Sequence, residues 1–368
     1  MKISIHTCYV LHAIPMIAFL LLLHPAHNES AKTQTSIPRK FRWVTKDSAL
    51  RYLVQEMSVM DEFQKDILGP FETVRVSGTE ENKKVQEHIK SLFLKWGWHV
   101  ELDRFEDSTP YGTKEFTNII ATHNPNKPQR IVLACHFDSK YFKGGKFVAA
   151  TDSAVPCAIL LETVRQMQCL LDKGSRDKSS AKDISLQLVF FDGEEAFKAW
   201  TAKDSLYGAR HLAKRYEEES EPGDPSDIKK INKIRELVLL DLIGTTDTQF
   251  TSQFSSTSDL FAQLIKTEKH LRSNGFLTGK HSGPIFSDRQ GWGGIEDDHK
   301  PFLERGVDIL HLISTPFPSV WHKMTDDWAH LDFGLIDDFS RIFRVFLSNV
   351  LHLQPEDRGC RRKSNPEL

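Results

Sequence analysis

The amino-acid sequence predicts an α/β fold: a three-layer sandwich in which a mixed and largely parallel central sheet is flanked by helices. Short apolar runs alternate along the chain with segments of helical periodicity, and such alternation is typical of helices packed on both faces of a mostly parallel sheet. The composition, 39% hydrophobic and 27% charged, is that of an ordinary globular protein. A chain of 368 residues can bury one large core or two ordinary ones.

Helical periodicity marks the segments that should cover the sheet. The first two are residues 47–68 and 79–96. The second begins at Thr79, carries glutamates in its first turn and stops at Gly97, which are common start and stop signals of helices. The others are residues 154–172, 204–217, 257–274 and 335–351.

Apolar runs of strand length lie between these helices. They occupy residues 117–122 (TNIIAT), 130–135 (RIVLAC), 184–191 (ISLQLVFF), 236–242 (ELVLLDL) and 307–313 (VDILHLI). Their length and their branched side chains indicate strands that are buried on both faces. Two charged stretches, residues 172–183 and 217–230, indicate surface loops.

The amino-terminal segment has the layout of a secretory signal peptide, which we predict over residues 1–27. Lys2 precedes an apolar run from Cys8 to Leu23, and a polar segment follows. The run is shorter than the ~20 apolar residues that cross a bilayer comfortably. We therefore expect a cleaved signal and a secreted protein without a stable membrane partner. Signal anchorage in the Golgi is the alternative.

The rest of the chain is predicted to form one domain over residues 43–355. Residues 28–42 read as a solvated linker, in which Asn28 begins the glycosylation acceptor pattern NES. Residues 356–368 form a polar tail. The sequence contains no internal repeat and no change in composition that would divide this domain. We expect the protein to be a monomer.

Charge and cysteine usage narrow the classes of partner and compartment. Lysine plus arginine (48) nearly balance aspartate plus glutamate (50), so no basic field predicts a nucleic-acid partner. Four cysteines follow the signal and allow three pairings: Cys135, Cys157, Cys169 and Cys360. A bridge from Cys135, at the end of a strand, to Cys157, early in the next helix, is geometrically reasonable in an oxidising compartment. Two buried reduced thiols are the alternative.

Metal-type side chains follow the predicted strands at the ends where ligands gather in α/β proteins. They are His136, Asp138, Asp152, Asp192, Glu194, Glu195 and Asp241, followed by Asp297, Asp298, His299, His311 and His322. A single histidine or aspartate in such a position is more often a helix cap or a satisfied polar group. The whole set is unusual for a structural core, because buried carboxylates are costly unless they are paired or bound to a cation.

A divalent metal resolves this cost. Two carboxylates and one neutral imidazole form a charge-balanced ligand set for Zn²⁺, and a fourth position left free is typical of a catalytic site. Glu194 and Glu195 are adjacent, so one can bind the metal while its neighbour faces the substrate as general acid/base. The residues alone leave a crowded set of candidate ligands and do not choose between one metal and two.

A set of motifs resembles those of one known family. The motifs are ACHFDSK, ATDSAVPCA, FFDGEEAF, DSLYGARHLA, LLDLIG, IEDDHKPFLERGV and HLISTPFPSVWH. Through them the sequence resembles the glutaminyl-peptide cyclotransferases, or glutaminyl cyclases, from about Trp43 to Leu353. That family has the fold of the two-zinc aminopeptidases, but its known animal members use one zinc. The resemblance therefore implies a zinc aminopeptidase-like fold with one zinc per chain.

The resemblance also implies roles around the metal. Asp152, Glu195 and His322 would be the zinc ligands, and Glu194 would be the proton shuttle. His136 occupies the place that binds a second metal in the aminopeptidases, yet in the cyclases it is not a ligand.

Further roles follow from the same resemblance. Asp241 matches a carboxylate that hydrogen-bonds the shuttle and the substrate, and Asp297 matches a second carboxylate in the proton network. A disulfide between Cys135 and Cys157 is implied. The implied pocket residues are Trp200, Ile295, Phe317 and Trp321. One position departs from the pattern, because Glu296 stands where glutamine is expected.

The activity implied is conversion of an amino-terminal glutamine to pyroglutamate with loss of ammonia. Its substrates would be peptides and proteins that begin with glutamine, with amino-terminal glutamate as a further candidate. Two alternatives stay open. The first is a two-zinc aminopeptidase, whose second site His136, Asp152 and Asp241 could supply. The second is a non-catalytic binding domain on the same fold, although such relatives usually lose ligands and none is lost here.

Overall fold

The structure, a computed structural model, describes residues 39–174, 183–221, 227–281, 283–291 and 293–353, together with Pro355 and Cys360. The predicted signal peptide, Asn28 and most of the predicted linker lie outside the described residues, as does the predicted tail apart from Cys360. From Arg39 onward the chain forms one compact unit. Within the described part, no helix combines the length and the apolar character needed to cross a membrane.

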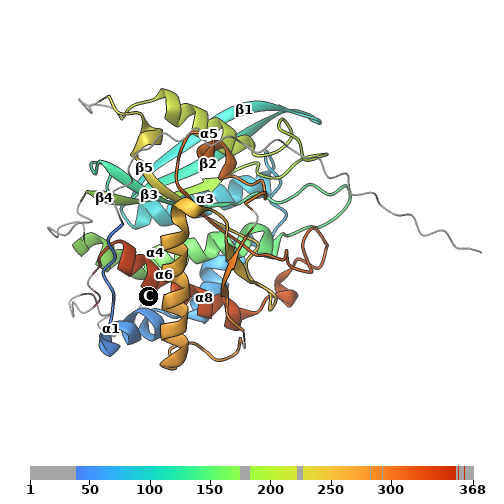
Figure 1. Ribbon diagram of the computed structural model, residues 1–368. Helices are drawn as coiled ribbons and strands as arrows, with labels where there is room; N and C mark the ends of the chain where they lie inside the picture. The colour runs from blue at the N-terminus through green and yellow to red at the C-terminus, as the bar shows by residue number, and fades with distance from the viewer. Residues whose placement is uncertain are drawn as a thin grey trace, which may run out of the picture. The chain divides into compact units, whose positions relative to one another are not determined.

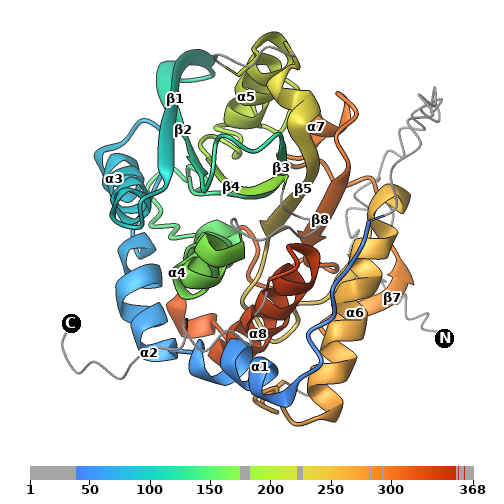
Figure 2. The same cartoon turned by 90° about the vertical axis from the view of Figure 1, so that its left-hand side faces the viewer.

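A six-stranded sheet forms the centre of this unit (Figure 1), and its strands follow the order β1-β2-β4-β3-β5-β8 (Figure 2). Its strands are β1 (His99–Thr109), β2 (Gly112–Thr122), β3 (Gln129–His136), β4 (Ile184–Phe191), β5 (Ile234–Asp241) and β8 (Ile309–Ile313). The neighbours from β4 to β8 pair in parallel, whereas β2 pairs antiparallel with both β1 and β4. The predicted mixed and largely parallel sheet is therefore confirmed. Two short strands, β6 (Phe250–Ser252) and β7 (Phe286–Gln290), pair separately.

The edge strand β1 is an element that the apolar pattern does not predict. Its sequence, HVELDRFEDST, is rich in charge, and most of its side chains are partly or fully exposed. It pairs with β2 along its whole length, from His99 opposite Thr122 to Thr109 opposite Gly112. A strand with one neighbour needs no apolar run, and charges on its open side discourage pairing with another chain.

Helices cover both faces of the sheet and complete the three layers (Figure 2). One face carries α3 (Glu80–Lys95), α4 (Val155–Gly174), α6 (Ser258–Ser273) and α8 (Phe333–Val350), and the other carries α5 (Tyr207–Glu218) and the short α7 (Lys300–Leu303). Each face has its own apolar cluster. Leu133 and Val238 belong to the first cluster, and their neighbours Val132 and Leu237 belong to the second, because successive side chains of a strand point to opposite faces.

The predicted helix over residues 47–68 is interrupted. Helix α1 (Asp47–Arg51) continues in wider, π-helical turns over Tyr52–Glu56, and α2 (Met60–Glu62) continues likewise over Phe63–Leu68. Between the two halves, Ser58 donates its hydroxyl to Asp337 of α8. The helix is thus interrupted at the point where Ser58 contacts another helix.

Two disulfides tie α4 to its surroundings. Cys135, at the end of β3, is bonded to Cys157 in the first turn of α4, with the two Cα atoms 5.7 Å apart. This is the predicted bridge. Toward the other end of the helix, Cys169 is bonded to Cys360 near the carboxyl terminus, with the two Cα atoms 5.5 Å apart. The sequence had left this second pairing open.

Candidate metal centre and active site

The candidate site lies beyond the carboxyl ends of β3, β4 and β5, the edge where open α/β sheets bind ligands. Strand β4 leads directly to Glu194 and Glu195, and β5 ends at Asp241. Asp152 lies between β3 and the start of α4, and His322 follows β8. Four separate segments of the chain therefore contribute to one site.

Three of the predicted ligands come together at this edge. Nε2 of His322 lies 3.4 Å from Oδ2 of Asp152 and 3.3 Å from Oε1 of Glu195, and the three atoms all lie within 4.8 Å of one another. Two ligand atoms that are each about 2.1 Å from a tetrahedral zinc ion are about 3.4 Å apart. The separations therefore fit a metal ligand set.

The carboxylate oxygens of this set lack hydrogen-bond donors. Oδ2 of Asp152 and Oε1 of Glu195 are buried and accept no hydrogen bond from the described residues. Such oxygens are costly to bury, and a cation between them would remove that cost. The side chain of His322 is 25% exposed, so the set is open on the side where a substrate can approach.

The charges of the set support one another. Burial lowers the pKa of His322, but Asp152 and Glu195 outweigh it and raise the pKa to about 9. Burial also opposes ionisation of Asp152, yet His136 and His322 hold the pKa of that carboxyl well below its usual range. The Asp152 carboxylate is therefore ionised at neutral pH, and a bound metal would replace the proton on His322, because a metal ligates the neutral imidazole.

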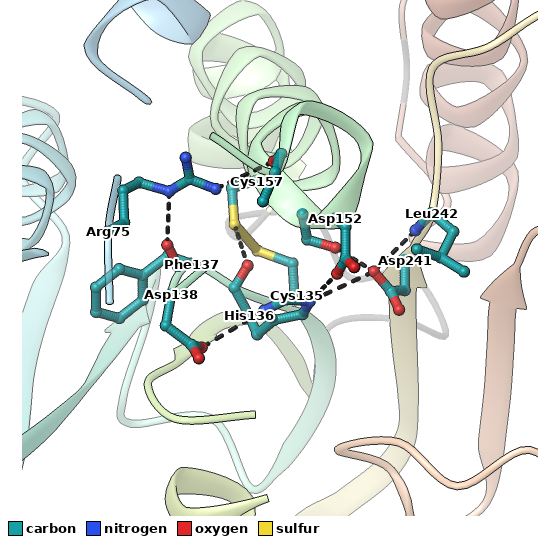
Figure 3. The surroundings of a disulfide bond; sticks show 11 residues. Arg75, Cys135, His136, Phe137, Asp138, Asp152, Cys157, Asp241 and Leu242 are labelled. Carbon is teal, nitrogen blue, oxygen red and sulfur yellow. Dashed lines mark hydrogen bonds and ion pairs between the residues drawn. A yellow bond between two sulfur atoms is a disulfide. The ribbon is translucent and has the colours of Figure 1, made fainter. Parts of the chain in front are cut away.

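A second group with ligand-like spacing consists of His136, Asp152 and Asp241. Its oxygens already have partners. Oδ1 of Asp152 lies 3.1 Å from Nε2 of His136, and Oδ1 of Asp241 accepts the Leu242 N–H (Figure 3). The same Asp241 oxygen accepts a hydrogen bond from the Ser153 hydroxyl. This group is the second metal position considered for an aminopeptidase, and it has less need of a cation than the first.

A third group consists of Asp297, His299 and His311. Oδ2 of Asp297 lies 2.7 Å from Nε2 of His311, and its Oδ1 accepts the N–H of Asp298. Burial lowers the pKa of His299 to about 3 and that of His311 to about 4, so both imidazoles are neutral. In this group too, the carboxylate of Asp297 is satisfied by hydrogen bonds.

Asp138 holds the backbone of the two adjacent glutamates. Its Oδ1 accepts the N–H of Glu194 at 3.1 Å, and its Oδ2 accepts the N–H of Glu195 at 3.2 Å. Oδ1 also lies 3.4 Å from Nδ1 of His136. One buried carboxylate thus fixes the turn from which both glutamate side chains project.

Glu194 is buried beside the metal set among other acids. Burial raises the pKa of Glu194 well above its ordinary value; His136 opposes this, and Glu195 and Asp297 add to it. Burial likewise raises the pKa of Asp241 to about 6. Carboxyls with raised pKa values can take up and release a proton near neutral pH, as a general acid/base must.

Two of the predicted aromatic residues, Phe317 and Trp321, lie beside His322 of the ligand set. The rings of Phe317 and Trp321 meet edge to face with centroids 4.8 Å apart, and Trp321 stacks on His322 at 4.0 Å. Trp200 and Trp321 are 40% and 37% exposed, unlike aromatic residues of a core. They are therefore available to a ligand.

Ile295 and Glu296 precede Asp297 on one segment. Ile295 is partly buried, and the Glu296 carboxylate is ion-paired with Lys300. Oε2 of Glu296 also accepts the indole N–H of Trp200 at 3.0 Å. The departure from the family pattern at Glu296 therefore places a carboxylate against a predicted wall of the pocket.

Comparison with known proteins identifies the family. Residues 118–347 match the model of peptidase family M28. Bovine glutaminyl-peptide cyclotransferase is 43% identical over 312 residues, which are 83% of this chain and 86% of the bovine protein. The chain belongs to the glutaminyl-peptide cyclotransferases.

Other relatives agree with this membership. The glutaminyl-peptide cyclotransferase-like protein of Mus musculus is 45% identical over 292 residues, 78% of this chain and 74% of the mouse protein. The crystal structure of Macrostomum lignano glutaminyl cyclase matches with a TM-score of 0.78 and 37% identity, over 87% of this chain and 98% of that one. A leucine aminopeptidase precursor from Bacteroides thetaiotaomicron matches with a TM-score of 0.58 at 20% identity, over 85% of this chain and 99% of that one, and shows the shared fold alone. The predicted zinc aminopeptidase-like fold is confirmed.

In this cyclotransferase, Lys140 touches the metal set although it was not predicted as a site residue. Its Nζ lies 2.9 Å from Oε2 of Glu195, the carboxylate oxygen that does not face His322. The ammonium group thereby fixes the orientation of a candidate ligand. Its place in the motif ACHFDSK, four residues after His136, was the available signal.

Arg75 is a second cation that sequence reasoning missed in the cyclotransferase chain. Its buried guanidinium donates a hydrogen bond to the carbonyl oxygen of Phe137 at 2.9 Å (Figure 3). It donates another to the carbonyl oxygen of Ala149 at 3.2 Å. These carbonyls belong to the segments that lead to Asp138 and Asp152. An arginine between Val74 and Val76 was the only hint in the sequence, and such a pattern is not specific.

Three non-glycine residues of the cyclotransferase site have left-handed backbone conformations. They are Ala149, with φ of 48°, and Leu242 and His322, each with φ of 54°. Such conformations cost about 1–3 kcal/mol and persist where the surrounding structure holds them, often at functional sites. All three lie within three residues of a site carboxylate or are themselves part of the metal set.

Proposed function

We propose that this glutaminyl-peptide cyclotransferase family member converts amino-terminal glutaminyl residues of peptides and proteins to pyroglutamate and releases ammonia. The observation that carries the proposal is an open three-ligand set beside the buried Glu194, in a chain 43% identical to bovine glutaminyl-peptide cyclotransferase. Amino-terminal glutamate is a further candidate substrate.

Asp152, Glu195 and His322 would hold one zinc ion per chain. The spacing of their ligand atoms and the two carboxylate oxygens without donors support this assignment. Two carboxylates and an imidazole with an open fourth position suit catalytic zinc. When bound, the ion supplies Lewis acidity at the γ-carbonyl oxygen of the substrate.

Glu194 would carry the proton. The α-amine nitrogen of the substrate attacks the γ-carbonyl carbon of its own side chain, and the new C–N bond releases a proton to the Glu194 carboxylate. The same proton then passes to the side-chain nitrogen as its bond to the γ-carbon breaks and ammonia leaves. Glutamine thus becomes pyroglutamate plus ammonia without an external nucleophile or co-reactant.

Asp241 and Asp297 would keep the amine and the shuttle aligned. Asp241 is held by Ser153 and by the Leu242 N–H, so its second oxygen can accept from the substrate amine. Asp297 is held by His311 at 2.7 Å. Fixed acceptors of this kind cost little reorganisation during the reaction.

Trp200, Phe317 and Trp321 would hold the glutamine side chain folded back on its own amine, with Ile295 beside them. Because the reaction is intramolecular, correct positioning supplies much of the rate enhancement. The same walls exclude water, and so limit hydrolysis of the side-chain amide to glutamate.

A two-zinc aminopeptidase is the weaker alternative. It would need a second ion between His136, Asp152 and Asp241. Oδ1 of Asp241 already accepts hydrogen bonds from the Ser153 hydroxyl and the Leu242 N–H, and a second ion bound to this oxygen would have to displace those donors.

We further propose that the protein works as a monomer in the secretory pathway. Its two disulfides fit an oxidising compartment. Cleavage of a signal over residues 1–27 would release a domain over residues 43–355 as a secreted enzyme, and anchorage in the Golgi by the same segment is the alternative.

The test is ammonia release from a peptide that begins with glutamine, measured before chelation, after chelation and after zinc is restored. We expect ammonia in proportion to the loss of free α-amine, an inactive chelated enzyme and recovery with zinc. The matched control is the same peptide with an acetylated amino terminus, which cannot cyclise. Release of a free amino acid instead of ammonia would favour the aminopeptidase, and cyclisation by the chelated enzyme would contradict the metal assignment.

A further inference from the structure

Exposed lysines border the open side of the metal set. Lys143 and Lys146 lie on the segment that follows Lys140, and Lys323 follows His322 directly; all three rim side chains are exposed. We call Lys143, Lys146 and Lys323 the lysine rim.

The two segments that carry the lysine rim pack against each other. A Cβ atom on Gly145 would lie 2.8 Å from Cε of Met324, so the backbone between the first two rim lysines lies directly against the residue that follows Lys323. The ring of Phe147 faces the imidazole of His322 with centroids 6.3 Å apart. The lysine rim is therefore local to one side of the candidate active site.

The same segment is joined to the metal set at its other end. Lys140 places its Nζ 2.9 Å from Oε2 of Glu195. Because Lys140 and Phe147 contact two of the three candidate ligands, the chain between them runs along the border of the site. Lys143 and Lys146 lie within this stretch.

The positive charge of the lysine rim is not balanced locally. No carboxylate of the described residues forms an ion pair with a rim lysine, and Lys323 donates only to the Ser319 carbonyl oxygen, at 2.6 Å. Asp326 is buried and accepts the Thr151 N–H.

Other acids of this region also have partners, among them the exposed Asp247, whose Oδ2 accepts the Ser319 N–H at 3.1 Å. Asp327 lies 2.7 Å from Nδ1 of His330, and Glu296 is ion-paired with Lys300. The exposed ammonium groups of the rim therefore place positive charge beside the metal set, although the whole chain has a formal net charge of −2.

We propose that the lysine rim selects substrates by charge and favours peptides with acidic side chains in the positions that follow the amino-terminal glutamine. The inference rests on the proposed function, because it concerns the remainder of the same substrate. Under the proposed function only the first residue enters the pocket, and each further residue of an extended chain advances by roughly 3.3–3.6 Å. The next few side chains thus leave the pocket beside the rim.

Surface charge pairs contribute modestly and are screened by salt. Two acidic side chains should therefore raise kcat/KM by about three- to tenfold at low ionic strength, mainly through KM. This advantage should shrink in 0.5 M sodium chloride, because at about that ionic strength the screening length is only a few ångströms.

The experiment compares three amidated pentapeptides, Gln-Ala-Asp-Asp-Ala, Gln-Ala-Asn-Asn-Ala and Gln-Ala-Lys-Lys-Ala, at low and high salt. The variants are the triple change Lys143→Glu, Lys146→Glu and Lys323→Glu, and the matched control Lys269→Glu, an exposed position of α6. We expect the wild type and the control to prefer the acidic peptide. The triple variant should prefer the basic peptide, and its kcat/KM for the neutral peptide should change less than its kcat/KM for either charged peptide.

The outcomes distinguish failure of the lysine-rim proposal from failure of the proposed function. Equal kcat/KM values for the three peptides with the wild-type enzyme, or an unchanged preference in the triple variant, would overturn the role of the lysine rim and leave the proposed function intact. Failure of the wild type to cyclise any of the peptides would overturn the proposed function and this inference with it.

Discussion

The two oxygens of Asp152 face different partners. Oδ1 lies 3.1 Å from Nε2 of His136, whereas Oδ2 faces His322 and accepts no hydrogen bond from the described residues. In a two-metal site such a carboxylate could bind one ion with each oxygen. Here Nε2 of His136 lies against one oxygen, an arrangement that favours a single metal position at the other.

Substitutions at Glu194 and Glu195 should have different effects on turnover and on metal binding. Glu194→Gln should leave the metal bound and lower kcat by about 10²- to 10⁴-fold, because the amide cannot carry the proton. The measurements are metal content by elemental analysis and ammonia release from a glutamine peptide. The matched variant Glu195→Gln should lose metal and activity together. Near-normal turnover by the Glu194→Gln variant would contradict the proposed role of Glu194 as the proton shuttle.

Asp138 is expected to affect metal binding indirectly, by orienting the backbone of Glu194 and Glu195. Asp138→Asn should weaken metal affinity about 10- to 100-fold, because the amide replaces one of the two acceptors that hold the N–H groups of Glu194 and Glu195. Competition with a chelator measures the affinity. The control is Asp338→Asn in α8, where another buried aspartate accepts a backbone N–H, that of Thr278. Equal metal affinities in the two variants would contradict the orienting role of Asp138.

At the scale of elements, the second disulfide ties α4 to the carboxyl-terminal end of the chain. Cys360→Ser should destabilise the protein by roughly 2–4 kcal/mol, because Cys169 and Cys360 are 191 residues apart and their bond restricts the unfolded chain. Denaturant unfolding measures the loss. Since the bond lies away from the metal set, kcat on a glutamine peptide should stay within about twofold of the wild type. A large loss of kcat with unchanged stability would contradict this separation.

The elements that could be predicted from the sequence are those buried on both faces. Strands β3, β4 and β5 read as apolar runs because helices cover them on either side. Strand β1 could not be predicted in this way, because a charged edge strand carries no such run. The interruption near Ser58 also depends on a partner in α8 that is 279 residues away in sequence, which local periodicity does not register.

At the scale of the whole molecule, the position of the site could be predicted more fully than the hydrogen bonds within it. Residues at strand ends meet at one edge of a parallel sheet, so the crowd of candidate ligands was visible in the sequence. Which oxygens lack donors depends on tertiary neighbours such as Ser153 and Leu242. The resemblance to the cyclases selected Asp152, Glu195 and His322, and the spacing of their ligand atoms supports that choice.

Metal removal should affect the stability of the whole domain. A ligand that binds only the native state stabilises it by about 2.7 kcal/mol at a hundredfold excess over Kd, and a domain of this size gains roughly 2–4 °C in Tm per kcal/mol. Chelation should therefore lower Tm by roughly 5–10 °C, as followed by thermal unfolding. The His322→Ala variant should show no chelator-dependent shift, and a shift as large as that of the wild type would place the metal elsewhere.

The central claim is that one metal ion, held by Asp152, Glu195 and His322, supports the reaction. The most direct measurement is the number of zinc ions per chain in fully active, purified protein, determined by elemental analysis against protein concentration. The account predicts one zinc ion per chain. During chelation, the rate of ammonia release should fall in proportion to the zinc that is lost. Two zinc ions per chain at full activity would contradict it.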